Sequence, residues 1–456
     1  MPHQIVILGA GISGLATAWF LKQSLGSAVH IQIIENSSRT GGWIQTLEAD
    51  GFIFEQGPRS GRTKGTGQET LALAEALGLQ DQVLVPHSDA SNRYILNDGK
   101  LTRMPKHFWE IPFSPLTRGW LPAIWRDWTK PKRTEEDESI HSFFSRRLGK
   151  KWADGLIDPF VSGIYAGDCS KLSVKSCFPL FNEWEEKRGS LLRGAWHHKH
   201  PSNDQSPFIQ SIRRFPLFSF KEGMETLPRA LTQELKDLLL LNTGIKRLEL
   251  KASAITVHLE NGKQIKADYL ISTIPATALG SLLSSTPLAA PLQQLPYANL
   301  SIVNLGFETS VLPYQGFGYL VPSREKQKIL GCVWDSSIFP QQNKEPHQTR
   351  LTVMMGGSRH PEMSEMSEKD SLEMALETLH QHLGIRAEPK TVQVKKAKEA
   401  IPQFEVGYSQ WKSQIQEGMH QLSPRLLLSG SAWSGVSIND CVAHARQLAE
   451  HISILL

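Results

Sequence analysis

The sequence predicts a mixed architecture: an α/β domain on a parallel sheet, an α+β domain with a mixed sheet, and a helical module. Three observations support this fold class. The chain opens with a strand, a glycine-rich turn and a helix, and apolar runs near residues 270 and 426 suit the same sheet. Residues 300–357 contain three further strand-like runs. Prolines break residues 103–133 into short helical pieces.

The opening segment has the pattern of a dinucleotide-binding βαβ unit. The strand IVIL runs into GAGISG, then into a helix and a second strand that ends at Glu35. Gly9 permits the tight turn, Gly11 lets the backbone approach a pyrophosphate, and Gly14 lets helix and strand pack closely. The helix N-terminus would face the phosphates, and Glu35 would accept hydrogen bonds from ribose hydroxyls. The pattern predicts a Rossmann-like domain, but NAD and FAD share it.

A second glycine pair follows the acidic residue and bears on the choice between these cofactors. Arg39-x-Gly41-Gly42 suggests a ligand that extends beyond the pyrophosphate and again needs close approach of the backbone. Near the C-terminus, GVSINDC leads into a helix with an apolar face, which Asn439 or Asp440 can cap. Its N-terminus would stabilise negative charge on a reduced flavin, although an ordinary capped surface helix has the same local pattern.

Composition and charge restrict the classes of function. With 40% hydrophobic and 21% charged residues the chain is typical of soluble globular proteins, and a net charge of +4 is too small to indicate a nucleic-acid partner. Four widely spaced cysteines indicate reduced thiols in a cytoplasmic protein. No metal is expected, because His197, His198 and His200 lie in a polar loop without convergent ligands.

The segment 103–133 combines cations with tryptophan. Seven Lys or Arg residues stand against two acids, and four of the twelve tryptophans lie among them. This combination is typical of a bilayer interface and is compatible with peripheral contact with the cytoplasmic face of a membrane. The alternative is a set of helices that pack onto their own core and expose a basic face.

Several motifs resemble one flavoenzyme family. Arg39-x-Gly41-Gly42 resembles the second motif of the flavin amine-oxidase superfamily, and GFIFEQGPRS resembles a narrower group, the oxygen-dependent, FAD-containing protoporphyrinogen oxidases. The resemblance continues in the same order along most of the chain. The further matching stretches are NRYIL (92–96), SGIYAGD (162–168), LSVKSCFP (172–179), GMETLPRAL (223–231), LISTIPATAL (270–279), QGFGYLVPS (315–323), LTVMMGG (351–357) and SGSAWSGVSINDC (429–441).

The resemblance implies an enzyme of haem biosynthesis. It would oxidise protoporphyrinogen IX to protoporphyrin IX by successive hydride transfers to non-covalently bound FAD, with O2 as terminal acceptor giving H2O2. The sequence offers no obligatory side-chain base, which is consistent with a cofactor that carries the reactivity. Two alternatives stay open: oxidation of coproporphyrinogen III to coproporphyrin III, and a non-catalytic binding protein similar to the GDP-dissociation inhibitors. A homodimer is compatible with the sequence, which does not give the oligomeric state.

The resemblance also implies a division of labour between two arginines. Arg93 would bind a propionate of the substrate through a bidentate contact, and Arg59 would serve the flavin side. Ser162 departs from the arginine that some relatives have there, which puts a second propionate contact in doubt. The substrate-binding residues expected on this basis are Arg93, Gly163, Phe317, Leu320 and Met354. The expected cofactor-binding residues are Gly9, Ala10, Gly11, Ile12, Ser13, Gly14, Glu35, Asn36, Arg39, Gly41, Gly42, Trp43, Gly57, Pro58, Arg59, Ser60, Ile245, Ser431, Val436, Ser437 and Ile438.

These interpretations give a domain organisation in which the nucleotide domain is discontinuous. We expect residues 1–88, 206–288 and 401–456 to form the FAD-binding domain, residues 89–205 the helical module for membrane contact or substrate entry, and residues 289–400 the substrate-binding domain. Cys441 lies near the expected flavin edge, but nothing in its motif demands a covalent link to the flavin, and a small buried thiol is the expected state.

Overall fold

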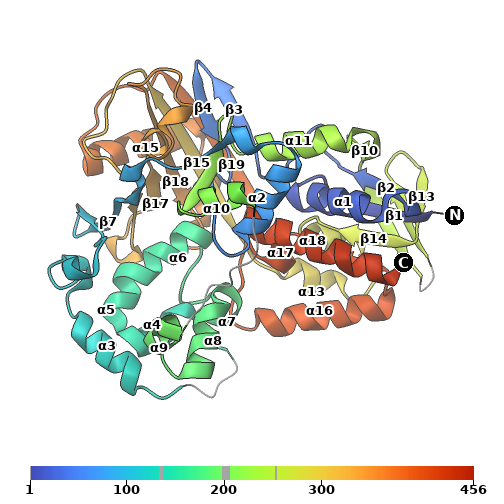
Figure 1. Cartoon of the computed structure of the whole chain (residues 1–456), viewed down its shortest axis with the longest axis horizontal. Coiled ribbons are helices and arrows are strands. Elements are labelled where there is room, and N and C mark those ends of the chain that lie inside the picture. Colours follow the sequence, from blue (N-terminus) through green and yellow to red (C-terminus); the bar gives the residue numbers. More distant parts are fainter. Residues whose placement is uncertain (1, 133–136, 198–205, 252–253) are drawn as a thin grey trace.

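A parallel five-stranded sheet forms the centre of the nucleotide domain (Figure 1) in this computed structural model, which describes residues 2–132, 137–197, 206–251 and 254–456. The strand order β10-β2-β1-β14-β20 brings together N-terminal, central and C-terminal segments of the chain, as the sequence predicts. The first strand is central because its apolar residues are buried on both faces of the sheet. These strands are β1 (His3–Leu8), β2 (Val29–Ile34), β10 (Leu239–Leu240), β14 (Tyr269–Ser272) and β20 (Leu426–Leu428).

Alternate residues of β1 supply two different cores. Ile5 and Ile7 pack with the helices on one face, whereas Val6 and Leu8 pack against a three-stranded antiparallel sheet and helices on the other. The small sheet comprises β11 (Ile245–Leu250), β12 (Ile255–Leu259) and β13 (Gln264–Ala267), the last two joined by the predicted Asn261-Gly262 turn. The helices are α1 (Ile12–Leu25), α2 (Gly67–Ala76), α10 (Pro207–Ile212), α11 (Thr226–Glu234), α12 (Ala276–Leu282), α13 (Ala289–Gln293), α16 (Tyr408–Leu422), α17 (Ser431–Ser434) and α18 (Ile438–Leu455).

A seven-stranded mixed sheet forms the second domain, with order β19-β15-β18-β17-β16-β7-β8. Its outer face carries an apolar core with α15 (Glu368–Leu383), which ends at Gly384 as the sequence predicts. The outward residues of β15 and β18, such as Val303 and Val353, belong to this core. The strands are β7 (Arg93–Asn97), β8 (Lys100–Arg103), β15 (Tyr297–Phe307), β16 (Gly318–Leu320), β17 (Ile329–Val333), β18 (Thr349–Gly356) and β19 (Thr391–Pro402).

One pairing in this sheet differs from the expected domain organisation. Strands β7 and β8 lie in the range 89–205, which we expected to form the helical module. They are instead the edge of the substrate sheet, with β7 parallel to β16. The physical reason is the alternation of Tyr94 and Leu96, which pack into the core of the sheet, with Arg93 and Ile95 on the other face.

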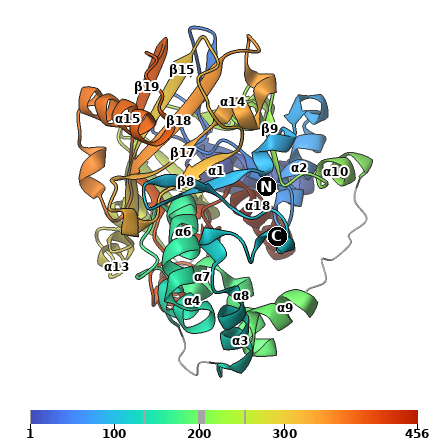
Figure 2. The same ribbon diagram turned by 90° about the vertical axis from the view of Figure 1, so that its left-hand side faces the viewer.

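The helical module lies below the substrate sheet (Figure 2), and α6 is the helix of the module that lies next to the sheet. A π-helical segment, Ala153–Ile157, joins α5 to α6 without a break in the helix. The predicted pieces of the segment 103–133 are two short 3-10 helices, Phe108–Glu110 and Pro115–Thr117, followed by α3. The helices of the module are α3 (Trp120–Thr129), α4 (Ile140–Leu148), α5 (Lys150–Trp152), α6 (Asp158–Tyr165), α7 (Val174–Cys177), α8 (Pro179–Arg188) and α9 (Leu191–His197).

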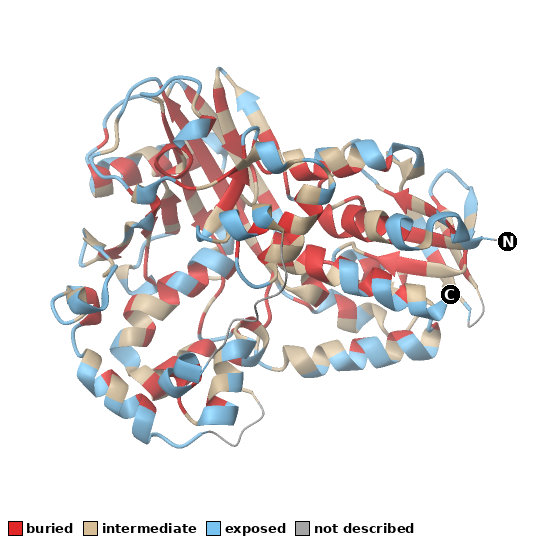
Figure 3. Ribbon diagram, in the orientation of Figure 1, coloured by how far each residue is buried: buried red, intermediate tan, exposed pale blue. Residues whose placement is uncertain are grey.

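Short strands connect the nucleotide domain to the substrate sheet. The hairpin β3–β4 lies against β15, where the ring of Phe52 fills the space over Gly306. Burial is highest where these two domains meet and in their central strands, whereas the outer helices of the module are exposed (Figure 3). The connecting elements are β3 (Thr46–Ala49), β4 (Phe52–Glu55), β5 (Gly61–Arg62), β6 (Val83–Leu84), β9 (Leu217–Phe220) and α14 (Asp335–Ile338).

Candidate active site

The loop between β1 and α1 has the geometry that a dinucleotide needs. Gly9 has φ +96°, and a side chain on Gly14 would place its Cβ 2.0 Å from the carbonyl oxygen of Gly9. Helix α1 begins at Ile12 without any side-chain cap, so its first N–H groups, including that of Ser13, keep their capacity for a ligand. Gly11 differs from Gly14, because its added Cβ would make only an ordinary contact, at 3.8 Å from Gly42 Cα.

The second glycine pair lies directly against this loop. The N–H of Gly41 donates to the carbonyl of Ala10 at 2.8 Å, and Gly11 and Gly41 form an isolated parallel bridge. The guanidinium of Arg39 donates to the carbonyl of Thr40 at 2.7 Å and also to that of Gly42. Arg39 therefore stabilises the second glycine turn itself, because the carbonyls that it binds lie in residues 40–44.

Glu35 stands at the end of β2, as the sequence predicts. One carboxylate oxygen accepts from the N–H of Ala10 at 2.8 Å, and the other accepts from the N–H of Ser37 at 2.9 Å. The backbone of Glu35 pairs with Leu240 and Thr243, which lead into β11 and Ile245. Asn36 and Trp43 are both exposed. The Glu35 carboxylate is thus fixed in place by the same loop that carries the glycines.

The start of α18 corrects one expectation. The N-cap is Ser437, whose hydroxyl accepts from the N–H of Asp440 at 3.1 Å, rather than Asn439 or Asp440. Asn439 and Asp440 lie inside the first turn, and their side chains bind elsewhere: Asn439 accepts from Thr70, and Asp440 accepts from Thr66. Sequence alone did not separate three good capping residues within four positions, Ser437, Asn439 and Asp440.

Helices α1 and α18 pack side by side, and their N-termini come together. The thiol of Cys441 in the first turn of α18 lies beside the side chain of Ser13 in α1, and burial raises the pKa of this thiol. Two helix N-termini therefore face one region, next to Val436 and Ile438. Ser431 begins α17, the short helix that precedes this turn. Their convergence supports the expectation that both ends serve one ligand.

The turn Gly57-Pro58-Arg59-Ser60 carries a buried arginine. Its Nε donates to Asp335 at 3.1 Å and one Nη donates to Thr352 at 3.0 Å, so Arg59 joins the nucleotide domain to the substrate sheet. The other nitrogen, Nη1, is buried and has no hydrogen-bond partner among the described residues, and the same is true of Nε2 of the neighbouring Gln56. Two buried donors without acceptors on one loop indicate a polar group that the protein itself does not supply.

A glutamate below this turn is unusually basic. Glu55 accepts hydrogen bonds from the N–H of Met224 at 2.7 Å and from the hydroxyl of Thr46 at 3.0 Å. Burial raises its pKa to about 7, although these hydrogen bonds and Arg59 act in the opposite direction.

The inner face of the substrate sheet gathers the residues expected to bind substrate. Its register places Arg93, Gly318, Val333, Thr352 and Asn304 in one row across five strands. The parallel row, two residues along, is Ile95, Leu320, Gly331, Met354 and Ile302.

Two glycines open a trough in these rows. Gly318 has φ +128°, and an added Cβ would lie 2.1 Å from the carbonyl oxygen of Cys332. Gly331 stands between Leu320 and Met354, which are two strands or about 10 Å apart. Two neighbouring positions of this sheet face, Gly318 and Gly331, therefore carry no side chain, and the apolar residues Leu320 and Met354 lie on either side of Gly331. We use the word trough for this strip of the sheet face.

Arg93 and Phe317 lie together at one end of this face. The guanidinium of Arg93 stands over the ring of Phe317, 5.0 Å from its centroid. It has no hydrogen-bond or ion-pair partner among the described residues. Desolvation by the surrounding protein lowers the pKa of Arg93, although the side chain is exposed. An arginine oriented by an aromatic ring and otherwise unpaired is suited to bind an incoming carboxylate.

Gly163 on α6 closes the trough from the side of the helical module. A Cβ on Gly163 would lie 2.7 Å from Cδ2 of Leu320, so helix and sheet are in contact there. Phe160 and Ile164, on the same helix, are partly exposed. The structure thus brings the five predicted substrate residues close together, with Arg93, Phe317, Leu320 and Met354 on the substrate sheet or at its edge and Gly163 opposite them on α6.

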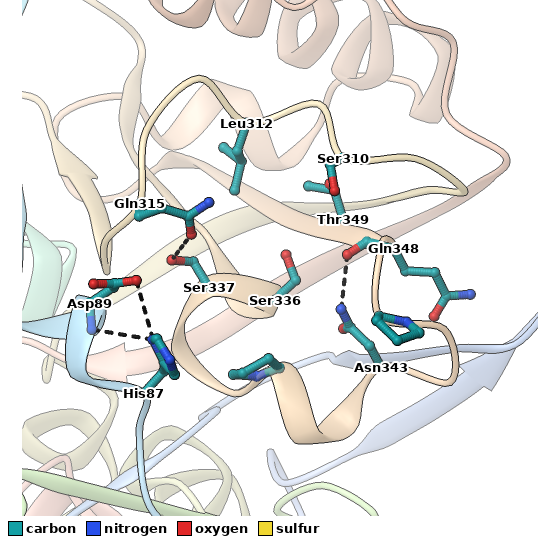
Figure 4. Close-up of a pocket in the computed structure, with 12 residues that line it drawn as sticks. His87, Asp89, Ser310, Leu312, Gln315, Ser336, Ser337, Asn343, Gln348 and Thr349 are labelled. Carbon is teal, nitrogen blue, oxygen red and sulfur yellow. Dashed lines mark hydrogen bonds and ion pairs between the residues drawn. The ribbon is translucent and has the colours of Figure 1, made fainter.

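A different hollow of about 200 Å³ lies beside α14 (Figure 4). Its walls are polar and bind one another: Ser337 donates to Gln315 at 3.1 Å, and His87 pairs with Asp89 at 3.3 Å. Its lining includes none of the residues predicted for cofactor or substrate. The lining is mainly polar and offers a hydrophobic ring little apolar surface, so this hollow is not the candidate site.

The segment 103–133 exposes many of its aromatic side chains over the part of it that the structure describes. Trp125 on α3 is 70% exposed and Phe113 is 87% exposed. In the described part of the chain, no helix has the length and apolar character needed to cross a bilayer. Of the three histidines considered as metal ligands, His198 and His200 lie outside the described residues, and His197 binds the carbonyl of Arg193. The described residues contain no cluster of three or more metal-ligating side chains.

Sequence reasoning missed several residues of the site. Asp335, Thr352 and Asn304 surround Arg59, and Thr352 donates to Asn304 at 2.6 Å. Thr352 lies inside the quoted stretch LTVMMGG, and the alternation of that strand could have shown that it shares a face with Met354. Asp335 had no comparable signal, because its partner Arg59 is 276 residues away.

The fold and the two interlocked glycine loops define a dinucleotide-dependent oxidoreductase of Rossmann-like architecture. The model of the flavin containing amine oxidoreductases matches residues 12–453, and the chain belongs to this family. The protoporphyrinogen oxidase of Bos taurus is 35% identical over 99% of this chain and 98% of its own length. The coproporphyrinogen III oxidase of Bacillus subtilis is 30% identical over 96% of this chain and 95% of its own.

A solved structure supports the same assignment at the level of the fold. The crystal structure from Exiguobacterium sp. 255-15, assigned as a protoporphyrinogen oxidase, superimposes with a TM-score of 0.84. It is 26% identical, and the match covers 100% of both chains. The flavoenzyme family predicted from the motifs is therefore confirmed, which excludes an inhibitor-like binding protein as the main interpretation.

Proposed function

We propose that the chain oxidises protoporphyrinogen IX to protoporphyrin IX with FAD as its bound cofactor. The observation that carries the proposal is the inner face of the substrate sheet, where two glycines and apolar residues lie next to the guanidinium of Arg93, which has no hydrogen-bond or ion-pair partner among the described residues. A flat apolar macrocycle with carboxylates at one edge matches both features. Relatives named for this activity, with matches covering nearly all of both chains, support the same substrate.

The residues present fit FAD rather than a shorter flavin. The uncapped N-terminus of α1 and the approach of Gly42 to Gly11 provide for a pyrophosphate, and Glu35 stands where a ribose would lie. The orphan donors of Arg59 and Gln56 offer hydrogen bonds to a polar ring edge. We expect no covalent link, because the Cys441 thiol is buried and its pKa is raised.

Bound FAD would supply the hydride acceptor, and dioxygen would be the final electron acceptor. The chain's own residues bind and orient. Arg93 would fix the rotation of the macrocycle by gripping a propionate, while Leu320 and Met354 exclude water from the apolar part. The N-terminus of α18, capped by Ser437, would stabilise negative charge that develops on the cofactor side. Arg59 is bound to Asp335 and joins the two domains, so it is poorly placed to grip the substrate.

The test is anaerobic mixing of the purified protein with protoporphyrinogen IX, in which flavin bleaching and porphyrin fluorescence are followed together. The proposal predicts that the flavin bleaches before oxygen is admitted, because the bound FAD accepts the first of the three two-electron steps. Porphyrin fluorescence should rise only when admitted oxygen reoxidises the flavin for the two further steps. Acid precipitation should release the flavin, and chromatography should identify it as FAD. A flavin that does not bleach, or bleaching that is not followed by porphyrin fluorescence after oxygen is admitted, would contradict the proposed substrate.

Coproporphyrinogen III is the second candidate substrate. The observation in its favour is the match to bacterial relatives of that name, including the one from Bacillus subtilis. This substrate carries more carboxylates, and Ser162 supplies no cation beside Gly163. We therefore expect a lower kcat/KM for coproporphyrinogen III than for protoporphyrinogen IX, measured from product masses in a mixture of both.

We also propose peripheral membrane contact through the segment 103–133. The exposed aromatic side chains of this segment lie among its cationic residues, and Trp196 on α9 is exposed nearby. Together they form an amphipathic surface that suits the headgroup region of a bilayer. Flotation with anionic vesicles at low salt should carry the wild-type protein upward. The variant Trp125→Ser/Trp128→Ser should float less, and wild-type protein that stays at the bottom would contradict this contact.

A further inference from the structure

Helix α6 is attached to the substrate sheet at both of its ends. At its N-terminus, the carboxylate of Asp158 accepts from the N–H of Ser323 at 2.7 Å, just beyond the end of β16. Just past its C-terminus, the carbonyl of Ala166 accepts from the N–H of Ser358 at 2.8 Å, just beyond the end of β18. The contact of Gly163 with Leu320 lies between these two attachments.

An arginine completes the N-terminal attachment. One nitrogen of Arg359 donates to Asp158 at 2.5 Å and to Asp168 at 3.0 Å. The side chain of Asp158 is only 2% exposed, and that of Arg359 is 24% exposed. The thiol of Cys169 also donates to Asp158 at 3.2 Å. A single buried carboxylate therefore binds a residue beyond β16, a residue in the loop after β18 and a residue in the segment that follows α6.

The C-terminal attachment has little freedom. Ala166 has φ +48°, a conformation that few residues other than glycine adopt. Gly357 packs against it so closely that an added Cβ would lie 2.4 Å from the carbonyl oxygen of Ala166. Because this end is set by backbone contacts, the side chains of Asp158 and Arg359 decide how closely the other end of α6 approaches the sheet.

We propose that Asp158 and Arg359 are positioning residues that set the height of Gly163 above Leu320, and with it the width of the substrate trough. The inference rests on the proposed function of that trough. Neither residue lies on the sheet face that carries Arg93 and Met354, so they act through the placement of α6. The ion pair is also charge-unbalanced, with two aspartates to one arginine, so Arg359 holds both acids together.

The experiment compares variants in steady-state oxidation of protoporphyrinogen IX, together with flavin absorbance and the melting temperature. Arg359→Met should raise KM roughly tenfold while kcat stays within about twofold, because the trough is displaced but the cofactor site is untouched. Arg359→Lys, which keeps the charge, should recover part of the loss. Lys344→Met is the matched control, since it removes another ion pair between separate segments, with Glu48, and should leave KM unchanged.

A second variant separates positioning from stability. Arg359→Met alone leaves a buried carboxylate without its cation, so the protein can lose stability for that reason. Asp158→Asn/Arg359→Met removes both charges and should recover the melting temperature, yet keep the raised KM. In a Leu320→Ala background, where the contact with Gly163 is lost, Arg359→Met should change KM by less than about threefold.

Each outcome decides the inference. An unchanged KM in Arg359→Met, a KM that returns to the wild-type value in the double variant, or additive effects with Leu320→Ala would overturn it. If the wild-type protein oxidises no porphyrinogen at all, the proposed function fails instead, and the two failures are thereby distinguished.

Discussion

The nucleotide loops and the substrate face hold their functional atoms in different ways. In the loops, backbone groups hold one another in place. The N–H of Gly41 donates to the carbonyl of Ala10, and the backbone of Gly9 lies so close to Gly14 that a side chain there has no space. On the substrate face, side chains stand on a sheet register, and the guanidinium of Arg93 has only the ring of Phe317 beside it. The first region is therefore intolerant of added atoms, whereas the second should tolerate substitution and respond in affinity.

The largest effect should come from Gly14→Val. The Cβ would lie 2.0 Å from the carbonyl oxygen of Gly9, and relief requires backbone movement between β1 and α1. We expect a loss of about 3 kcal/mol or more in the free energy of unfolding, or failure to fold. Denaturant unfolding of the variant measures it. A midpoint equal to that of the wild-type protein would show that the loop is less rigid than described.

Gly11→Val should separate folding from cofactor binding. The Cβ at this position would meet only Gly42 Cα, at 3.8 Å, so the apoprotein should fold with a stability close to that of the wild-type apoprotein. The valine would occupy the approach to the pyrophosphate, and the purified variant should be colourless. Flavin absorbance and circular dichroism together test this, and a yellow variant would contradict the assignment of Gly11.

Arg93→Ala tests the other region. Removal of one charge-assisted contact should weaken substrate binding by about 1.5–3 kcal/mol, which corresponds to a rise in KM of roughly 10- to 150-fold. The flavin content should be unchanged. The KM of Arg93→Lys should lie between those of the wild-type protein and Arg93→Ala, because an ammonium keeps the charge but cannot form the bidentate contact. Steady-state kinetics provide the measurement. Equal KM values for the wild-type protein and Arg93→Ala would remove the arginine from the substrate site.

Glu55→Gln tests the junction between the regions through pH. The folded protein holds the Glu55 proton up to a pKa of about 7, whereas the ordinary value is 4.5. The folded state thus binds more protons between these values, so this group's contribution to stability falls as pH rises through that window and is level above it. Glu55→Gln should lose that slope, and urea midpoints at about pH 5 and about pH 8 would reveal it. The same slope in both proteins would assign it to another group.

Phe317→Leu should have the smallest effect. It removes the aromatic face beneath Arg93 but keeps an apolar side chain, so only the cation–π contact is lost. A change of about 0.5–1 kcal/mol corresponds to a two- to fivefold rise in KM. In an Arg93→Ala background the substitution should have no further effect, and an undiminished effect there would show that Phe317 acts independently of Arg93.

The sequence predicted the nucleotide domain well because its signals are local. Gly9 to Glu35 form a continuous pattern, and the motifs that follow are quoted from single stretches, so the family was predicted and is confirmed by relatives that match nearly the full length. The expected roles of individual residues stay predictions. The structure nevertheless brings the five substrate residues close together, four of them at the substrate sheet and Gly163 opposite them on α6.

The remaining features of the site depend on long-range contacts, which the sequence did not predict. The contacts of Arg59 with Asp335 and Thr352 join residues that are 276 and 293 positions apart. The contact of Asp158 with Arg359 spans 201 positions. No local sequence pattern indicates such contacts. The membership of β7 in the substrate sheet was missed for the same reason, because its partner β16 follows more than two hundred residues later. The cap of α18 was misplaced because Ser437, Asn439 and Asp440 are all good capping residues.

The discontinuous sheet has a consequence for the synthesis of this protein. Strands β1 and β2 are synthesised long before β20 and the start of α18, which follow more than 390 positions later in the chain. The cofactor site therefore cannot close until β20 and α18 have been synthesised, and until then the apolar faces of the early βαβ unit are incompletely covered. We expect a nascent chain stalled before residue 425 to bind chaperones and no flavin, so the synthesis of β20 and α18 controls when the enzyme matures.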